Sequence, residues 1–482
     1  MRLYSIIRHF IRIAAHLYFV DIQSSGLENT PRKGPVILAA NHPGSLMDAV
    51  LLSTQVPRKI SYLAKSDLFR FPFVSTLFDN LGVIPIYRPG QEPQHSERNV
   101  QAFGRVYQVL ENQGCIGIFP EGRNSPQRQV AELRTGTARM ALGAEARNNY
   151  QLGLCIVPIG LSFESRELFL SSALLSFEQP IWVADYACLH RENPEHAVRT
   201  LTQDLQRALR GQALHIEDLR LSQLVADLSD IVEPDPGPAH NGQKEAKQAV
   251  KANQGLLYSY WQKICSWFRP VAETDKDLQS ILRKRQETNR VLTEIAAQEP
   301  EAIEELRKAT ERYKDHLYQA RLREDLSQKF DKPVQERLVR LRMTLYALLM
   351  APFALVGFVH NIAPYLVTLF TARLFQDDAI RGFAYFAIGI LVFSLTYLMY
   401  GVCFWHFFHK SVPWTLVYLA ALLWTGFGFL RYRRTVMQYR DKILVRTFFQ
   451  SQEHLHRRLQ QERQAIIAKF QELQKKYSTV FH

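Results

Sequence analysis

The segment from Val36 to Asp48 reads VILAANHPGSLMD and places a histidine directly after an apolar, strand-like run. The apolar run VILAA predicts a strand. Pro43 suits the first turn of a helix, so His42 is expected at the strand-to-helix corner. Asp48 follows His42 by six residues, and residues six apart lie on different faces of a helix. The two side chains can therefore meet only if His42 lies outside the helix and turns back over it. Taken alone, the segment also fits a structural role, in which Asn41 is the N-cap of the helix, His42 is a histidine with its hydrogen bonds satisfied, and Asp48 does not contact His42.

Around this segment, residues 35–190 alternate short apolar runs with amphipathic patterns. Such alternation predicts an α/β domain with a mainly parallel central sheet. Helices are expected over Asn99–Asn112 and Thr137–Arg147, and residues 194–232 show polar amphipathic helical patterns. The expected strands are Val36–Ala40, Ile60–Ala64, Val83–Tyr87, Cys115–Phe119, Leu154–Leu161 and Ile181–Tyr186.

Three more motifs fall on expected strands or at their ends. FPEGRNS places Glu121, Gly122 and Arg123 after the strand CIGIF, where open α/β sheets bind ligands. The run GVIPIYR ends in Arg88, whose guanidinium can hold a phosphate through two hydrogen bonds. The third, IVPIGL, is a buried strand without chemistry of its own. Taken alone, FPEGRNS also fits an ordinary turn with an exposed ion pair, and Arg88 also fits a surface cation.

Together, the order and spacing of these motifs resemble the phospholipid/glycerol acyltransferase family, whose motifs read NHx4D, GxI…R, FPEGTRS and V-P-[IV]-G. The resemblance covers about residues 20–215 and includes LRTGTARMAL after the third motif. Two departures stand out. Five residues, not four, separate His42 from Asp48, which is similar to fungal-type glycerol-3-phosphate/dihydroxyacetone-phosphate acyltransferases and related bacterial proteins. The usual arginine of the third motif is Asn124 here, and Arg123 lies one place early.

The resemblance implies transfer of a fatty acyl group from a thioester, acyl-CoA or acyl-carrier protein, to glycerol-3-phosphate or dihydroxyacetone phosphate. His42 would be the general base and Asp48 its orienting partner, with backbone N–H groups at the helix start stabilising the oxyanion. Substrate binding falls to Arg88, Glu121, Gly122 and Arg123, the arginines holding the acceptor phosphate. No GxSxG elbow occurs in residues 35–190, which argues against a covalent acyl-enzyme.

Other functions remain open at this point. The acceptor could instead be 1-acylglycerol-3-phosphate or another lysophospholipid. A catalytically silent, membrane-anchored lipid-binding scaffold is the alternative from another class, and the intact His42 and Asp48 disfavour it. The net charge of +13 also suits nucleic acid, but no recognition motif is present, so no nucleic-acid partner is expected. Nothing in the sequence indicates the oligomeric state.

Composition and charge also limit the kind of protein and the partners that are expected. A hydrophobic fraction of 47% excludes a wholly disordered chain, and the excess of cations favours anionic partners such as a membrane surface. Five cysteines without a CxxC pair argue against a disulfide framework or a zinc site. No set of His, Cys and carboxylate residues has metal-ligand spacing, so no metal is expected. No cofactor is expected either, because the acyl-CoA or acyl-carrier protein is a co-substrate.

Residues 1–20 predict an amphipathic helix at the lipid interface, with packing on its own domain as the alternative. Its polar stripe is Ser5, Arg8, His9, Arg12 and His16. Residues 21–232 form the expected catalytic domain, followed by a linker over 233–255, a charged helical region over 256–340 and a charged helical tail over 433–482.

Residues 341–432 predict a membrane block. Phe383–Phe404 and Val412–Leu430 are long and apolar enough to cross a bilayer, whereas residues 344–371 are expected to form a broken helix or re-entrant segment. That expectation rests on His360, Asn361 and Pro364. Arginines flank the block on both sides, which predicts two cytoplasmic flanks, an even number of crossings and a catalytic domain on the cytoplasmic face of the inner or endoplasmic membrane. The alternative is a buried helical hairpin in a large soluble protein. The flanking arginines are Arg337, Arg340, Arg342, Arg431, Arg433 and Arg434.

Overall fold

The computed structural model describes residues 2–19, 21–70, 72–87, 95–123, 129–164, 171–232, 277–319, 336–375, 378–408, 411–451 and 453–478. Arg88, Asn124 and the expected linker over 233–255 lie outside these residues. The chain divides into two compact units. Unit 1 holds residues 1–215 and 370–390, and unit 2 holds residues 216–369 and 391–482.

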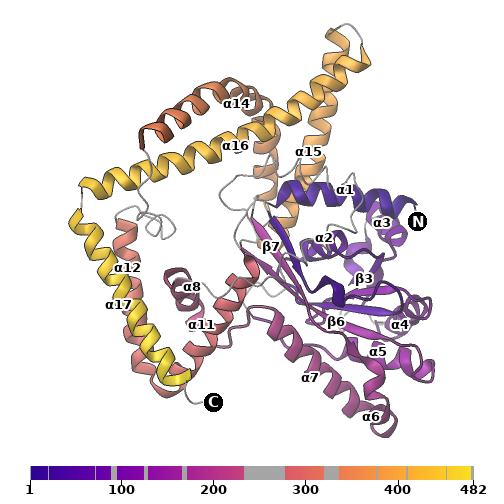
Figure 1. Cartoon of the computed structure of the whole chain (residues 1–482). Helices are drawn as coiled ribbons and strands as arrows, with labels where there is room; N and C mark the ends of the chain where they lie inside the picture. Colours follow the sequence, from indigo (N-terminus) through magenta and orange to yellow (C-terminus); the bar gives the residue numbers. More distant parts are fainter. Residues whose placement is uncertain are drawn as a thin grey trace. The chain divides into compact units, whose positions relative to one another are not determined.

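Unit 1 is built on a twisted sheet in the order β1-β7-β6-β2-β5-β3-β4, with β8 paired to β6 (Figure 1). Neighbouring strands run parallel except where β6 meets β7 and β8. The mainly parallel sheet predicted from the sequence is therefore confirmed. The strands are β1 (Asp21–Ser25), β2 (Val36–Ala40), β3 (Ile60–Lys65), β4 (Ile84–Ile86), β5 (Cys115–Ile118), β6 (Cys155–Phe163), β7 (Ser172–Phe177) and β8 (Ile181–Trp182).

Helices cover both faces of this sheet, and all five residues of β2 (VILAA) are therefore buried. Ile37 and Ala39 of β2 lie in one apolar cluster with α4, α5 and α7, while Val36, Leu38 and Ala40 lie in the other with α1 and α2. This division follows from the two-residue repeat of a strand. The helices of unit 1 are α1 (Arg2–Tyr18), α2 (Leu46–Gln55), α3 (Pro72–Leu81), α4 (His95–Glu111), α5 (Gly136–Arg147), α6 (Ala187–Glu192) and α7 (Pro194–Gln212).

Three local expectations differ from the structure. The strand expected over 181–186 ends at Trp182, because the chain then turns into a 3-10 helix (Val183–Tyr186) and buries Val183. α2 begins at Leu46, so Pro43 precedes the helix instead of starting it. The strand β1, DIQSS, was not predicted, because its sequence has no apolar run. It lies at the edge of the sheet, pairs with β7 alone and is only half-buried, so it needs few apolar residues.

One face of the first helix packs on its own unit, and its position at a lipid interface stays a prediction. Ala15 and Tyr18 are buried. Arg8, expected on an exposed polar stripe, instead donates to the carbonyl oxygens of Ser53 at 2.9 Å and Val56 at 2.6 Å. Since these carbonyls belong to the last turn of α2 and its C-cap, a cation there is stabilised. Phe10 stays 52% exposed on the outer side of the helix.

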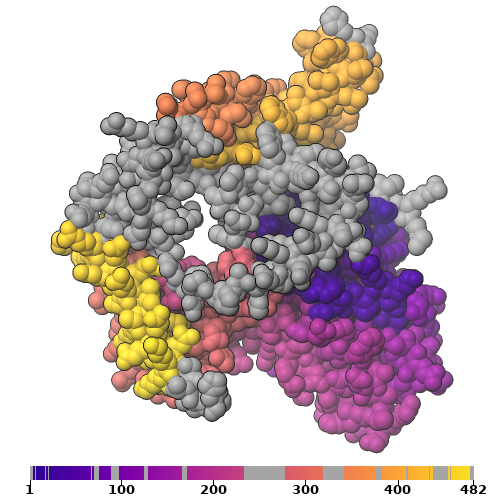
Figure 2. Space-filling model, viewed as in Figure 1, coloured from indigo at the N-terminus to yellow at the C-terminus, as the bar shows by residue number. Residues whose placement is uncertain are grey.

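Unit 2 contains a bundle of four helices, α8 (Ser222–Ile231), α11 (Leu278–Gln298), α12 (Pro300–Gln319) and α17 (Glu453–Ser478). Figure 1 shows α17 running alongside α12, and in Figure 2 the yellow atoms of α17 lie directly against the salmon atoms of the bundle. Lys469 and Lys476 of α17 pair with Glu305 and Glu299.

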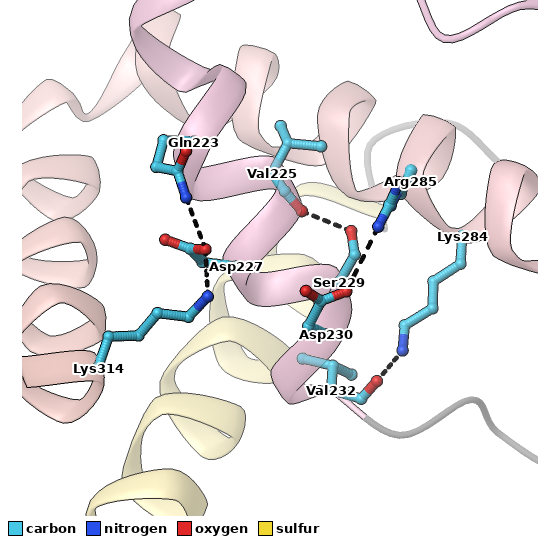
Figure 3. Close-up of polar contacts among 9 residues, drawn as sticks. All are labelled: Gln223, Val225, Asp227, Ser229, Asp230, Val232, Lys284, Arg285 and Lys314. Carbon is cyan, nitrogen blue, oxygen red and sulfur yellow. Dashed lines mark hydrogen bonds and ion pairs between the residues drawn. The ribbon is translucent and has the colours of Figure 1, made fainter. Parts of the chain in front are cut away.

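The short helix α8 holds the bundle together through polar contacts (Figure 3). Asp227 of α8 pairs with Lys314 of α12. Lys284 of α11 donates to the carbonyl of Val232, and Arg463 of α17 donates to that of Ile231 at 2.8 Å. Cations from two partner helices thus satisfy carbonyls at the C-terminal end of α8, where the helix dipole favours positive charge.

Three long helices form the apolar block: α14 (Glu336–Ala372), α15 (Asp378–Phe407) and α16 (Val412–Ser451). Each contains an apolar stretch long enough to cross a bilayer, Thr344–Ala372, Phe383–Phe407 and Val412–Met437, of 29, 25 and 26 residues. Phe386, near the start of the second stretch, is buried in unit 1 against Tyr18 of α1, and Ala384 close by is also buried.

The helix break expected near Pro364 is wrong, because α14 is continuous through this residue. A segment that returns to the side from which it started stays a prediction. A proline inside a helix leaves the carbonyl four residues earlier without its donor. Here that carbonyl belongs to His360, and the Tyr400 hydroxyl donates to it at 3.2 Å. Asn361 donates to the Gly357 carbonyl at 2.7 Å and accepts from the Tyr397 hydroxyl at 2.7 Å. Two tyrosines of α15 therefore satisfy the polar groups that suggested a break.

Candidate functional site

The site lies where β2 and β5 end side by side at the carboxyl edge of the sheet. The two strands run parallel, with Val36 opposite Cys115 and Ala39 opposite Ile118. His42 follows the last residue of β2 by two positions, and Glu121 follows the last residue of β5 by three. The topology therefore brings together two motifs that are far apart in the sequence.

His42 and Asp48 meet at this edge. His42 Nδ1 lies 2.9 Å from Asp48 Oδ2, and the Gly44 N–H donates to the same oxygen at 2.8 Å. Asp48 is fully buried, while the His42 side chain keeps 18% of its surface exposed. Because α2 begins at Leu46, His42 lies outside the helix and turns back over it, as the spacing required.

The turn that allows this contact is tight. Ser45 has φ 56° and ψ −133°, a conformation that side chains rarely adopt and that costs ~1–3 kcal/mol. A Cβ at Gly44 would lie 2.6 Å from Asp48 Oδ1 and 3.0 Å from the ring of Phe163, so only glycine fits there. Asn41 does not cap α2, which removes the alternative reading of this segment. Its side chain instead exchanges two hydrogen bonds with the backbone of Leu161, at 3.1 and 2.6 Å.

Aromatic rings support the histidine from the β5 side. The Phe119 ring stacks on the His42 imidazole, with centroids 4.0 Å apart and an interplanar angle of 13°. Tyr62 stacks behind Phe119, and its hydroxyl lies 2.9 Å from Ser53 Oγ and 3.0 Å from the Ala49 carbonyl. Burial raises the pKa of Tyr62 well above its ordinary value, so this ring stays neutral. The sequence reasoning missed Phe119, although it is the first residue of the FPEG motif.

Glu121 ties three segments together. It is 2% exposed, and its two carboxylate oxygens accept from the backbone N–H groups of His42 at 3.1 Å and Ala131 at 3.4 Å. Burial raises the pKa of Glu121, against the opposing effect of those two hydrogen bonds. Its carboxylate thus fixes the backbone at His42 instead of pointing to an arginine.

Of the remaining predicted site residues, Gly122 and Arg123 directly follow Glu121 in the same turn. Gly122 has φ 67°, and Arg123 is exposed. Arg88 is outside the described residues, although Asn99 exchanges hydrogen bonds with the backbone of the preceding Tyr87 at 3.0 and 2.7 Å. The described residues contain no group of three or more His, Cys, Asp or Glu placed to hold a metal ion.

Comparison with known proteins places a family model on this part of the chain. Residues 21–162 match the acyltransferase family model. The chain is 31% identical over 185 residues to glycerol-3-phosphate O-acyltransferase 2 of Saccharomyces cerevisiae, covering 37% of this chain and 24% of the relative. It is 27% identical over 177 residues to 1-acyl-sn-glycerol-3-phosphate acyltransferase of Borreliella burgdorferi, covering 36% of this chain and 64% of the relative.

The matched region is a part of each protein. The chain spans about a quarter of the first yeast relative's length and, at 23% identity, 41% of the length of glycerol-3-phosphate O-acyltransferase 1 from the same yeast. Among solved structures, the 1-acyl-sn-glycerophosphate acyltransferase PlsC of Thermotoga maritima is similar, with 20% identity, a TM-score of 0.33, and coverage of 44% of this chain and 81% of that one.

Proposed function

Because residues 21–162 form a domain of the acyltransferase family, we propose that the protein transfers a fatty acyl group from a thioester to a hydroxyl of glycerol-3-phosphate or dihydroxyacetone phosphate. The observation that carries the proposal is the contact between His42 Nδ1 and Asp48 Oδ2 at the carboxyl edge of the sheet. Binding alone would need neither residue in this arrangement.

The geometry supports His42 as the general base. A carboxylate only accepts hydrogen bonds, so its contact with Asp48 assigns the proton to Nδ1 and leaves the Nε2 lone pair for a substrate. An acceptor hydroxyl ionises far above pH 7, so Nε2 takes its proton as the oxygen attacks the thioester carbonyl. Collapse of the tetrahedral intermediate breaks the C–S bond, and the imidazolium returns the proton to the leaving thiolate.

The rest of the site has supporting tasks. The stack of Phe119 and the buried carboxylate of Glu121 hold the imidazole and its backbone in place. Backbone N–H groups in the turn before α2 stabilise the oxyanion. Of these, Met47 and Asp48 already donate to the carbonyls of Gly44 and Ser45, which leaves this task to the N–H groups of Ser45 and Leu46.

Binding of the acceptor is assigned to the glycine and the cations next to this edge. Arg88 follows the end of β4 closely, and Arg123 follows Gly122 in the FPEG turn. Arginine suits a phosphate because its planar fork donates two parallel hydrogen bonds. Gly122 keeps the turn compact beside Glu121.

The second candidate is acylation of 1-acylglycerol-3-phosphate. It is favoured by the relative from Borreliella burgdorferi, whose name gives that acceptor. A labelled acyl donor offered with glycerol-3-phosphate, dihydroxyacetone phosphate and 1-acylglycerol-3-phosphate in turn decides between them. Acylation of none of the three would contradict both candidates and leave another lysophospholipid acceptor or the silent lipid-binding scaffold.

We further propose that the protein crosses the membrane twice, with both units' soluble parts on the cytoplasmic side. The bundle supports this, because α12 precedes the apolar block and α17 follows it, yet the two helices pack together. His316 of α12 lies 2.8 Å from Glu462 of α17. Helices in contact outside the bilayer lie on one side of it, so the number of crossings between them is even.

The base of α15 supports the proposal that α14 is the helix that does not cross. Phe386 of α15 is buried against α1, so α15 starts on the side of the catalytic unit. Only five residues join Ala372 to Asp378, and at most ~3.6 Å per residue is too short to return across a core of about 30 Å. The arginines that precede the apolar stretch of α14 favour a cytoplasmic start for this helix. In the proposed topology α14 therefore begins and ends on the cytoplasmic side, and α15 and α16 make the two crossings.

A further inference from the structure

Arg134, which the motif reasoning did not single out, lies next to the candidate catalytic residues. The segment before it folds back on the FPEG turn, where the Arg134 N–H donates to the Pro120 carbonyl at 2.9 Å. Three residues earlier, Ala131 donates its N–H to Glu121, whose other oxygen accepts from the backbone of His42. One buried carboxylate thus links the backbone at His42 to the segment that carries Arg134.

The Arg134 side chain extends across Gly122. A Cβ at Gly122 would lie 2.9 Å from both Cδ and Nε of Arg134, so the arginine occupies the space that a larger residue would fill. Gly122 also has φ 67°, which favours glycine. Both features keep the guanidinium beside the turn that follows β5.

The charge of Arg134 is available to a ligand. Arg134 is exposed, and none of the ion pairs among the described residues includes it. The neighbouring Glu121 forms no ion pair with Arg134 among the described residues; its two carboxylate oxygens accept the backbone N–H groups of His42 and Ala131. By contrast, Arg58 in the same unit donates to the carbonyls of Pro31, Gly34 and Gln113, which is a structural use of arginine.

We propose that Arg134 binds the phosphate of the acceptor and thereby selects phosphorylated over unphosphorylated glycerols. This inference rests on the proposed acyl transfer. A guanidinium at this edge holds a phosphate dianion through paired, charge-assisted hydrogen bonds. The sequence offers a reason for its use, since position 124 of the third motif carries asparagine, which has no charge to offer.

The test compares Arg134→Ala with Arg139→Ala, an exposed arginine on α5 that serves as the matched control. For Arg134→Ala, kcat/KM for glycerol-3-phosphate should fall at least about tenfold, mostly through KM, since a hydrogen bond to a charged group is lost. The value for unphosphorylated glycerol should not change, and Arg134→Lys should recover part of the loss. Equal losses with both acceptors, or none, would overturn the proposal.

Arg134 could instead bind a phosphate of the acyl donor, because acyl-CoA also carries phosphates. The assay is therefore repeated with an acyl thioester of N-acetylcysteamine, which carries no phosphate. The loss in Arg134→Ala should persist with this donor, and a loss confined to acyl-CoA would overturn the assignment to the acceptor.

Direct binding separates this inference from the proposed function. Calorimetric titration of the full chain in detergent micelles with glycerol-3-phosphate should show binding that Arg134→Ala weakens about tenfold and Arg139→Ala preserves. Binding of this kind without any acyl transfer would refute the proposed function and leave Arg134 as a phosphate ligand. Unchanged binding in Arg134→Ala would refute the role of Arg134 whatever the activity.

Discussion

Phe386 of α15 packs edge-to-face against Tyr18 of α1, with ring centroids 5.6 Å apart. Each of the two residues is at most 5% exposed, and both belong to the apolar cluster that includes Met47 and Leu51 of α2. The base of α15, a helix long and apolar enough to cross a bilayer, is therefore part of the core that supports the His42 turn. Under the proposed function and topology, this contact holds the unit with His42 at the bilayer, where an acylated, lipid-soluble product would leave.

Phe386→Ala should destabilise unit 1 by about 3–5 kcal/mol, the usual cost of removing a buried phenylalanine. Thermal unfolding in detergent measures the effect. Phe407→Ala, which removes a ring that is 77% exposed on the same helix, is the control and should change stability little. Similar unfolding temperatures for the two variants would contradict the packing described for Phe386.

Two crossings by α15 and α16 predict which positions an impermeant thiol reagent reaches in intact cells. On a cysteine-free background, single cysteines are placed at Leu374, His409 and Ser451. Only position 409 should be labelled before the cells are opened, because it lies between the two crossing helices. Labelling at position 374 would show that α14 crosses the membrane.

Ser45→Gly should stabilise the protein by about 1 kcal/mol, because glycine adopts φ 56° without strain and loses only part of that gain to its freer unfolded chain. Ser45→Ala is the matched control, since it removes the hydroxyl but keeps the strained backbone. Denaturant unfolding compares the two. If alanine stabilises as much as glycine, the hydroxyl and not the backbone is responsible.

Glu121→Gln should destabilise unit 1 by about 1–3 kcal/mol, because an amide can accept one of the two backbone N–H groups and leaves the other unsatisfied. The deficit should also depend on pH. Burial raises the folded-state pKa of Glu121, so the folded protein holds the proton more tightly and the wild type loses stability as pH rises from about 4.5 through that higher pKa.

The variant lacks this titration, so its deficit should shrink over the same interval and be constant above it. Exposed Glu132→Gln is the control and should show neither effect. A stability deficit that grows with pH would contradict the raised pKa that burial gives Glu121.

The sequence predicted the parts of the site that depend on strand ends and motif order. It could state the condition for His42 and Asp48 to meet, but not that Ser45 would adopt the strained turn that brings them together. It could not find Phe119 as a stacking partner, because the contact joins two strands that are distant in sequence. Pro364 was read as a helix break, since the donor that compensates for it, Tyr400, comes from another helix. Polar β1 was missed because an edge strand needs little apolar sequence.

The central claim is that His42 is the base of an acyl transfer to a glycerol phosphate. The direct measurement is the single-turnover rate of acyl transfer from labelled acyl-CoA to glycerol-3-phosphate by the wild type, His42→Ala and Asp48→Asn, each first shown to be folded by thermal unfolding. Loss of a general base should lower the rate at least ~10²-fold in His42→Ala. Asp48→Asn should also be severely impaired, because the amide cannot hold the same tautomer. A folded His42→Ala variant with a rate close to wild type would contradict the account.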